Sequence, residues 1–185
     1  MELDAITYNI SYRNIKYPRI ELKTGRLLLV LPFDYDPDTI VKKHKDWIVR
    51  KTEFIKECLE HSSDKKIVER TDEEFKKVVH SFVRKISKEL GSQLNRIYFK
   101  KMKTKWASCS SKKNITINTL SKYLPDDILK YVIFHEVAHL IERKHNVKFW
   151  NIIEKKFKDV STKEKDLMIY WFLLQDKILK KNILK

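Results

Sequence analysis

Apolar residues recur with the period of an α-helix in the last third of the chain. Pro125 and the two aspartates after it suit a first helical turn, because proline fits that position and carboxylates favour the positive end of the helix dipole. The apolar positions that follow fall on one stripe: Ile128, Leu129, Val132, Ile133, Val137, Leu140 and Ile141. The pattern predicts a helix of about four turns.

Four further helices are predicted. One long helix begins at Pro37, and another begins with a capping box at Thr71 and ends at Gly91. Asn146 is a good N-cap for a helix through residue 157, and an amphipathic helix starts at Lys163.

Alternating and β-branched segments predict strands in two groups, each ahead of helical sequence. They lie at residues 6–13, 20–22 and 27–31 near the N-terminus, and at 96–101 and 114–120 before the helix that follows Pro125. This order predicts an α+β fold with an N-terminal antiparallel β-rich segment. With only two glycines in the chain, we expect one continuous domain over residues 1–185, within which residues 1–60 could form a β-rich subdomain.

The predicted helix after Pro125 carries the sequence His135-Glu136-Val137-Ala138-His139. Histidines four residues apart lie on one face of a helix and can bind one metal ion together. Glu136 is then placed to take a proton from a water that the metal activates. Histidine ligands favour zinc over magnesium or calcium. The motif therefore predicts a hydrolase with one Zn²⁺ ion. Hydrogen-bonded core histidines are the alternative.

His145 is a candidate third ligand. On an unbroken helix it would lie about 15 Å along the axis from His135 and about 80° around it, too far to share a metal ion. The chain must therefore turn back between Glu142 and Lys144, although it has no glycine there. Otherwise His145 is a surface histidine at a helix joint.

Several motifs together resemble the YgjP-like metallopeptidase family. They are Trp106-Ala107-Ser108-Cys109-Ser110, Ile115-Thr116-Ile117-Asn118, Pro125, Tyr131-Val132-Ile133, the sequence from His135 to Leu140, and His145 with Phe149-Trp150. The resemblance extends over nearly the whole chain and includes Lys45-Asp46-Trp47-Ile48. It departs at Ala107, where the family usually has glycine.

The resemblance implies a zincin-like fold and zinc-dependent peptide hydrolysis. It implies His135, His139 and His145 as the metal ligands and Glu136 as the catalytic base. The family is related to Wss1-type and SprT-type DNA-repair proteases, which suggests protein substrates associated with DNA.

Substrates of zinc peptidases generally lie extended along an edge strand near the metal helix. The predicted strand formed by Ile115, Thr116, Ile117 and Asn118 comes just before that helix and is our candidate. The alternative is an interior strand already paired on both sides. An oxyanion stabiliser is expected, but nothing in the sequence selects one among Tyr123, Tyr131 and Tyr170.

The formal net charge of +15 suits binding to polyanions. The densest basic cluster contains Lys100, Lys101, Lys103, Lys105 and Trp106, and cations beside an aromatic ring suit single-stranded nucleic acid. A lysine-rich proteome explains the charge equally well, and Trp106 could be a core residue.

Three functions remain in competition. They are a zinc peptidase acting on protein or peptide substrates, a metal-dependent phosphohydrolase acting on nucleotides, and a nucleic-acid-binding module with a structural zinc. Glu136 argues against the last, because a closed structural site needs no base. The chain has two cysteines, no apolar run of membrane-spanning length and no signal peptide at its start, so we expect a cytoplasmic protein without membrane contact. The oligomeric state is not predicted.

Overall fold

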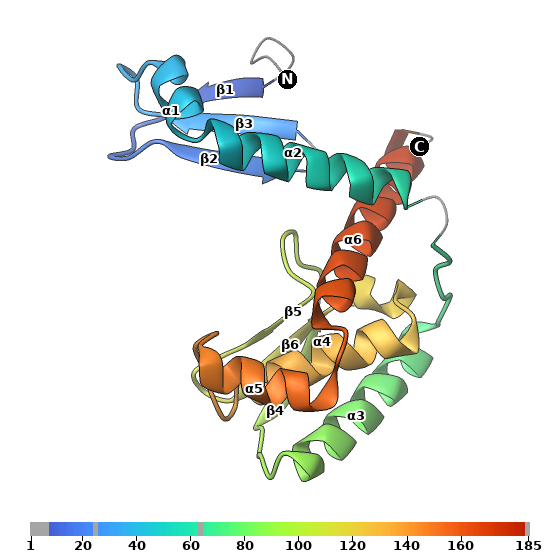
Figure 1. The fold of residues 1–185 in the computed structure, drawn as a ribbon. Helices are drawn as coiled ribbons and strands as arrows, with labels where there is room; N and C mark the ends of the chain where they lie inside the picture. The colour runs from blue at the N-terminus through green and yellow to red at the C-terminus, as the bar shows by residue number, and fades with distance from the viewer. Residues whose placement is uncertain (1–7, 24–25, 63–64, 184–185) are drawn as a thin grey trace. The chain divides into compact units, whose positions relative to one another are not determined.

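The computed structural model describes residues 8–23, 26–62 and 65–183 (Figure 1). The chain falls into two compact units, residues 1–64 with 171–185, and residues 65–170. The sequence-based expectation of a single domain stays a prediction. In the described part of the chain, every helix is too short or too polar to cross a lipid bilayer.

The first unit contains a three-stranded sheet and two helices. The strands are β1 (Tyr8–Tyr12), β2 (Arg19–Lys23) and β3 (Arg26–Leu31), in the order β1-β3-β2. β2 runs antiparallel to β3, whereas β1 runs parallel to it, so this sheet is mixed rather than wholly antiparallel as predicted. Residues 6 and 7 of the first predicted strand lie outside the described residues.

The predicted long helix of the first unit is two helices, α1 (Pro37–Lys43) and α2 (Lys45–Glu60). His44 interrupts it because its backbone leaves the helical conformation, with φ −115° and ψ 18°. Both helices pack their apolar stripes on the sheet. The core of this unit consists of Leu27, Leu29, Leu31, Ile40, Val41 and Ile48.

The second unit begins with α3 (Asp72–Glu89). The predicted capping box is confirmed, since the Glu74 amide donates to Thr71 Oγ1 and the Thr71 amide donates to Glu74. Gly91 follows the helix with φ +59°, a left-handed conformation that favours glycine. The later elements of this unit are η2 (Thr119–Tyr123), α4 (Asp126–Ala138), α5 (Val147–Lys156) and the start of α6 (Val160–Ile183).

The sheet of the second unit contains β4 (Arg96–Lys100), β5 (Ala107–Cys109) and β6 (Asn114–Asn118) in the order β4-β6-β5. β6 is therefore the central strand, parallel to β4 and antiparallel to β5. The sequence left two arrangements open for Ile115, Thr116, Ile117 and Asn118: the interior strand paired on both sides is confirmed, and the edge strand is wrong. The edge strands are β4 and β5, and β5, which the sequence pattern did not predict, is the one that contacts α4.

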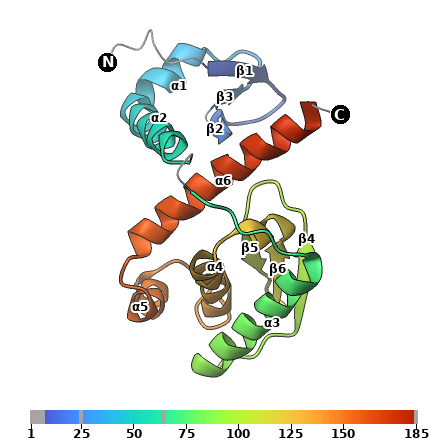
Figure 2. The ribbon, with the colours of Figure 1, turned by 90° about the vertical axis from the view of Figure 1, so that its right-hand side faces the viewer.

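Helix α4 contacts β5, α3 and α5 (Figure 1 and Figure 2). Most of its residues are buried, as expected of a helix that is apolar nearly all round. It ends at Ala138, about one turn earlier than predicted, and Ile141 lies half exposed in the turn that follows. The functional site lies beside this C-terminal end of α4.

Candidate active site

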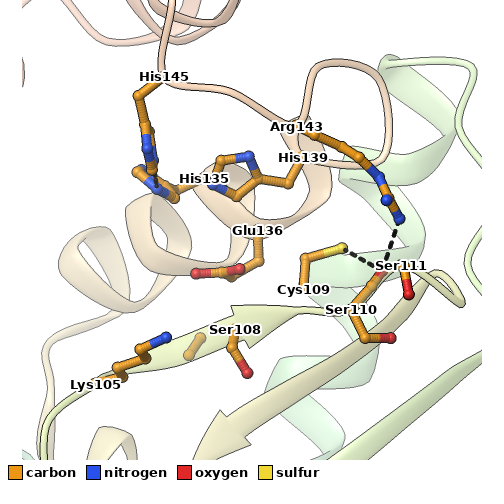
Figure 3. Close-up of a pocket in the computed structure, with 11 residues that line it drawn as sticks. Lys105, Ser108, Cys109, Ser110, Ser111, His135, Glu136, His139, Arg143 and His145 are labelled. Carbon is orange, nitrogen blue, oxygen red and sulfur yellow. Dashed lines mark hydrogen bonds between the residues drawn. The ribbon is translucent and has the colours of Figure 1, made fainter.

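Three histidines converge beside the C-terminal end of α4 (Figure 3). His135, His139 and His145 each offer one ring nitrogen, and these three nitrogens lie within 4.8 Å of one another. Nε2 of His135 is 2.9 Å from Nε2 of His145. Two nitrogens on one tetrahedral zinc ion lie about 3.3 Å apart, given Zn–N bonds of about 2.0–2.1 Å. The donor set therefore fits a zinc ion.

The loop between α4 and α5 returns His145 to this position. His139 is the C-cap residue of α4, and the amides of Ile141 and Glu142 both donate to the Ala138 carbonyl. The Glu142 carboxylate then accepts from the Lys144 amide. The chain thus turns back in the predicted place, with side-chain and backbone hydrogen bonds in place of a glycine.

Helix α5 places an aromatic ring behind the three imidazoles. Its predicted N-cap is confirmed, because the Phe149 amide donates to Asn146 Oδ1. The buried Phe149 ring lies 4.9 Å from His135, 4.5 Å from His139 and 4.7 Å from His145, measured between ring centroids. Phe149 therefore restricts the orientation of all three imidazoles.

A hydrogen bond sets the tautomer of His139. Its Nδ1 lies 3.0 Å from the Glu142 carbonyl, which can only accept, so Nδ1 carries the proton. Nε2 is then free to bind a metal ion. Histidine ligands of metals usually donate their other ring N–H in this way.

Burial keeps the imidazoles of His135 and His139 neutral. It lowers the pKa of His135 to about 3, and the neighbouring His139 and His145 act in the same direction. Burial also lowers the pKa of His139. Neutral imidazole is the form that binds a metal ion, so these rings are ready to act as ligands at neutral pH.

Glu136 points from α4 towards β5 and is only 8% exposed (Figure 3). Burial raises the pKa of its carboxyl to about 7, against the opposing effects of Lys105 and of a hydrogen bond from the Cys109 backbone N–H. A carboxyl with this pKa can accept and return a proton near neutral pH.

The site opens into a cleft of about 380 Å³ between β5 and the histidines. Besides the histidines and Glu136, its lining consists of Lys105, Ala107, Ser108, Cys109, Ser110, Ser111 and Arg143. The sequence reasoning did not identify Arg143 or the strand β5 as functional. Arg143 lies between two motif histidines in the sequence, but only the fold shows that its side chain reaches β5.

The predicted basic cluster lies on β4 and on the loop that leads to β5. Lys100, Lys101, Lys103 and Lys105 are exposed, and Lys105 alone of them lines the cleft. Trp106 is half-buried, and its carbonyl accepts from the Asn118 amide and from Ser121 Oγ. Trp106 is thus less available for base stacking than an exposed ring would be.

None of the three tyrosines considered from the sequence lines the described cleft. The Tyr131 hydroxyl donates to Glu164, and the Tyr170 hydroxyl donates to the Lys66 carbonyl. Apart from the histidines, the basic residues of the described cleft lining are Lys105 and Arg143.

Comparison with known proteins gives one family match. The model of the family described as YgjP-like, metallopeptidase domain, matches residues 56–169, more than half of the chain. No curated protein shows significant similarity to the chain.

Two solved structures of archaeal metallopeptidase zymogens are similar to part of the chain. The zymogen of abylysin from Pyrococcus abyssi is 25% identical, with 56% of this chain and 93% of that chain covered and a TM-score of 0.43. The zymogen of jannalysin from Methanocaldococcus jannaschii is 28% identical, with 56% and 95% covered and a TM-score of 0.43.

The family match decides between the enzyme classes that the sequence left open. It favours hydrolysis of peptide bonds over hydrolysis of nucleotides, and it agrees with a histidine cluster that can hold a metal ion. The chain belongs to the YgjP-like metallopeptidase family and is a zinc-dependent peptidase.

Proposed function

We propose that His135, His139 and His145 bind the zinc ion of this peptidase and that Glu136 is its general base. The convergence of three ring nitrogens within 4.8 Å is the observation that carries this assignment. The buried Glu136 carboxyl follows His135 on the same helix and faces the same cleft.

A zinc ion held by the three histidines would supply an activated water and polarise the substrate carbonyl. Glu136 takes the proton of the attacking water and delivers it to the leaving amine. The Cys109 N–H orients the Glu136 carboxylate for this transfer. A pKa of about 7 suits both halves of the transfer.

We propose that the substrate lies extended along β5. In an antiparallel pair, alternate residues turn their backbone groups towards the partner strand. The Ser110 amide donates to the Asn114 carbonyl, and the Trp106 carbonyl accepts from the Asn118 amide, so the alternate residues Ala107 and Cys109 turn their backbone groups away from β6. The Cys109 N–H donates to Glu136, which places this edge of β5 beside the base. An added peptide strand could therefore pair with β5.

Proteins associated with DNA are a further proposed substrate class. The exposed Lys100, Lys101 and Lys103 and the net charge of +15 support contact with phosphates. If this holds, single-stranded DNA should accelerate cleavage of a basic DNA-binding protein but not of an acidic protein. Equal rates with and without DNA would remove the proposal. A cytoplasmic location likewise stays a prediction.

The ligand assignment is tested by replacing each histidine singly with alanine. Each variant should lose bound zinc and cleavage of an unfolded protein substrate. His80→Ala, an exposed histidine on α3 outside the cleft, is the control and should keep both. A His145→Ala variant with full zinc content and activity would remove the third ligand from the assignment.

A further inference from the structure

We infer that Lys105 and Arg143 make this peptidase select substrates with acidic residues on both sides of the cleaved bond. The inference rests on the proposed function, because it takes the cleft along β5 as the place where the substrate binds.

Lys105 lies just before the start of β5 and lines the cleft. Its backbone is fixed, since its carbonyl accepts from Asn118 Nδ2 at 2.6 Å, and the Asn118 side chain is buried. Its side chain lines the same cleft as Glu136 (Figure 3). The positive charge of Lys105 therefore acts on one end of the cleft.

Arg143 approaches the other end of the same strand. It comes from the loop between His139 and His145, and its Nη2 lies 3.5 Å from the Ser110 carbonyl, directly after β5 (Figure 3). Burial raises the pKa of the nearby Cys109 thiol, and the charge of Arg143 opposes that rise. The side chain lines the cleft beside the proposed zinc ligands.

The two cations thus bracket β5, with Glu136 between them. Five residue steps separate Lys105 from Ser110, which corresponds to about 17 Å of extended chain at about 3.4 Å per residue. A peptide of about five residues laid along the strand therefore has one end near each cation. Because both ends are positive, the preference for acidic side chains does not depend on which way the peptide runs.

Charge balance inside the cleft supports an acidic substrate. Within the described lining, Glu136 is the one carboxylate, and it is buried and committed to proton transfer. Neither Lys105 nor Arg143 forms an ion pair with a carboxylate of the described residues. A substrate carboxylate would supply the missing counter-charge at each end.

The net charge of +15 could also attract acidic peptides without any specific site. Such attraction is screened by salt and does not depend on where in the peptide the acidic residue lies. Lys103 distinguishes the two explanations. It is exposed on the same loop as Lys105 but does not line the cleft.

The experiment compares cleavage of matched peptides by the zinc-loaded, full-length protein at physiological salt. The peptides differ only at the second and third positions on either side of the cleaved bond, which carry glutamate, glutamine or lysine. Enzyme variants are Lys105→Gln, Arg143→Gln, the double variant, the conservative Arg143→Lys and the control Lys103→Gln.

For the wild type, kcat/KM should be about tenfold higher with glutamate on both sides than with glutamine, and about threefold higher with glutamate on one side, as exposed charge pairs typically give. Lys105→Gln should abolish the preference on one side and Arg143→Gln the preference on the other, each measured as the ratio of kcat/KM for glutamate and glutamine peptides within the same variant. Arg143→Lys and Lys103→Gln should retain both preferences.

Equal cleavage of the three peptides by the wild type would overturn the inference while leaving the peptidase assignment intact. If the preference survives in the double variant, or if Lys103→Gln reduces it as much as Lys105→Gln does, the preference comes from the overall charge. Either result would also overturn the inference. If the wild type cleaves no peptide, the proposed function fails. In that case the preference for acidic peptides is tested by measuring how tightly the glutamate, glutamine and lysine peptides bind to the Glu136→Gln protein. Equal affinities for the three peptides would overturn the inference.

Discussion

At the scale of single residues, the environment of Glu136 acts on the pKa of its carboxyl in two opposite directions. Its carboxyl is buried beside β5, which raises its pKa to about 7, yet Lys105 and the Cys109 N–H stabilise the charged form. The group is therefore charged often enough to accept a proton and basic enough to hold it. Removing its ionisable oxygen should stop catalysis without disturbing the zinc ligands.

We predict that Glu136→Gln lowers kcat by about 10²- to 10⁴-fold, the usual contribution of a general base, while zinc content stays unchanged. Glu154→Gln, an exposed carboxylate on α5, is the control and should keep full activity. Steady-state kinetics and metal analysis of the same samples provide the test. A Glu136→Gln variant of undiminished kcat would exclude Glu136 as the base.

The metal-free protein should lose stability on acidification. The folded-state pKa of His135 is about 3, below its usual value near 6.5, so the unfolded chain takes up the proton first as pH falls. The stabilisation is therefore present above about pH 6.5 and decreases towards pH 3. Between pH 7 and 5 we expect a loss of about 1–2 kcal/mol.

Urea unfolding of chelator-treated protein across this pH range measures the effect. His135→Gln has no proton to bind at this position, so its stability should depend less steeply on pH. Parallel curves for the two proteins would show that His135 does not carry the effect.

At this scale the sequence was informative where chemistry depends on local spacing. The positions of His135, Glu136 and His139 follow from helix geometry alone. Placing His145 also required a turn, which its neighbours permit but do not specify. The approach of Arg143 to Ser110 depends on how β5 packs against α4, and no local pattern reports that.

At the scale of elements, one buried side chain organises the loop that leads to β5. Asn118, at the end of β6, accepts from the Met102 and Leu120 amides and donates to the Met102 and Lys105 carbonyls. Four backbone groups thus depend on a single amide. This explains how a loop rich in exposed lysines can hold the edge strand in a fixed position.

We predict that Asn118→Ala destabilises the protein by about 2–3 kcal/mol, because it leaves buried polar groups without partners. The cleft should also lose activity beyond the loss of folded protein. Thr116→Ala, a half-buried polar residue on the same strand, is the control and should cost less than about 1 kcal/mol. Chemical denaturation gives both values, and an equal cost for the two variants would refute the role of Asn118.

The differences between predicted and observed elements have physical causes. Strand β5 has three residues, too few for an alternating pattern to be recognised. Without β5 in the pattern, the sequence leaves open whether β6 is an edge or an interior strand. The apolar stripe on α4 continued to Ile141, but the chain leaves the helix at Ala138 because the loop must return His145. The capping box at Thr71 and the N-cap at Asn146 follow from the sequence because their signals are local.

At the scale of the whole molecule, the proposed catalytic residues all belong to the unit of residues 65–170. The other unit has its own apolar core around Leu29 and Ile48. Separate cores can unfold separately, whereas one cooperative domain unfolds in a single step. The single domain expected from the sequence is therefore open to a direct test.

We predict two unfolding transitions by calorimetry, of which zinc shifts only one. A ligand bound to the folded state alone stabilises its own unit, by about 2.7 kcal/mol at a hundredfold excess over Kd. The zinc-free protein and the His139→Ala variant serve as references. A single transition that zinc shifts as a whole would instead establish one domain over residues 1–185.

The most direct test of the central assignment is anomalous diffraction at the zinc edge from crystals of the zinc-loaded protein. We predict one zinc ion per chain, bound by His135, His139 and His145, with Nε2 of His139 as its donor atom and with Glu136 next to its open side. A zinc ion found elsewhere, or bound without His145, would contradict the proposed centre.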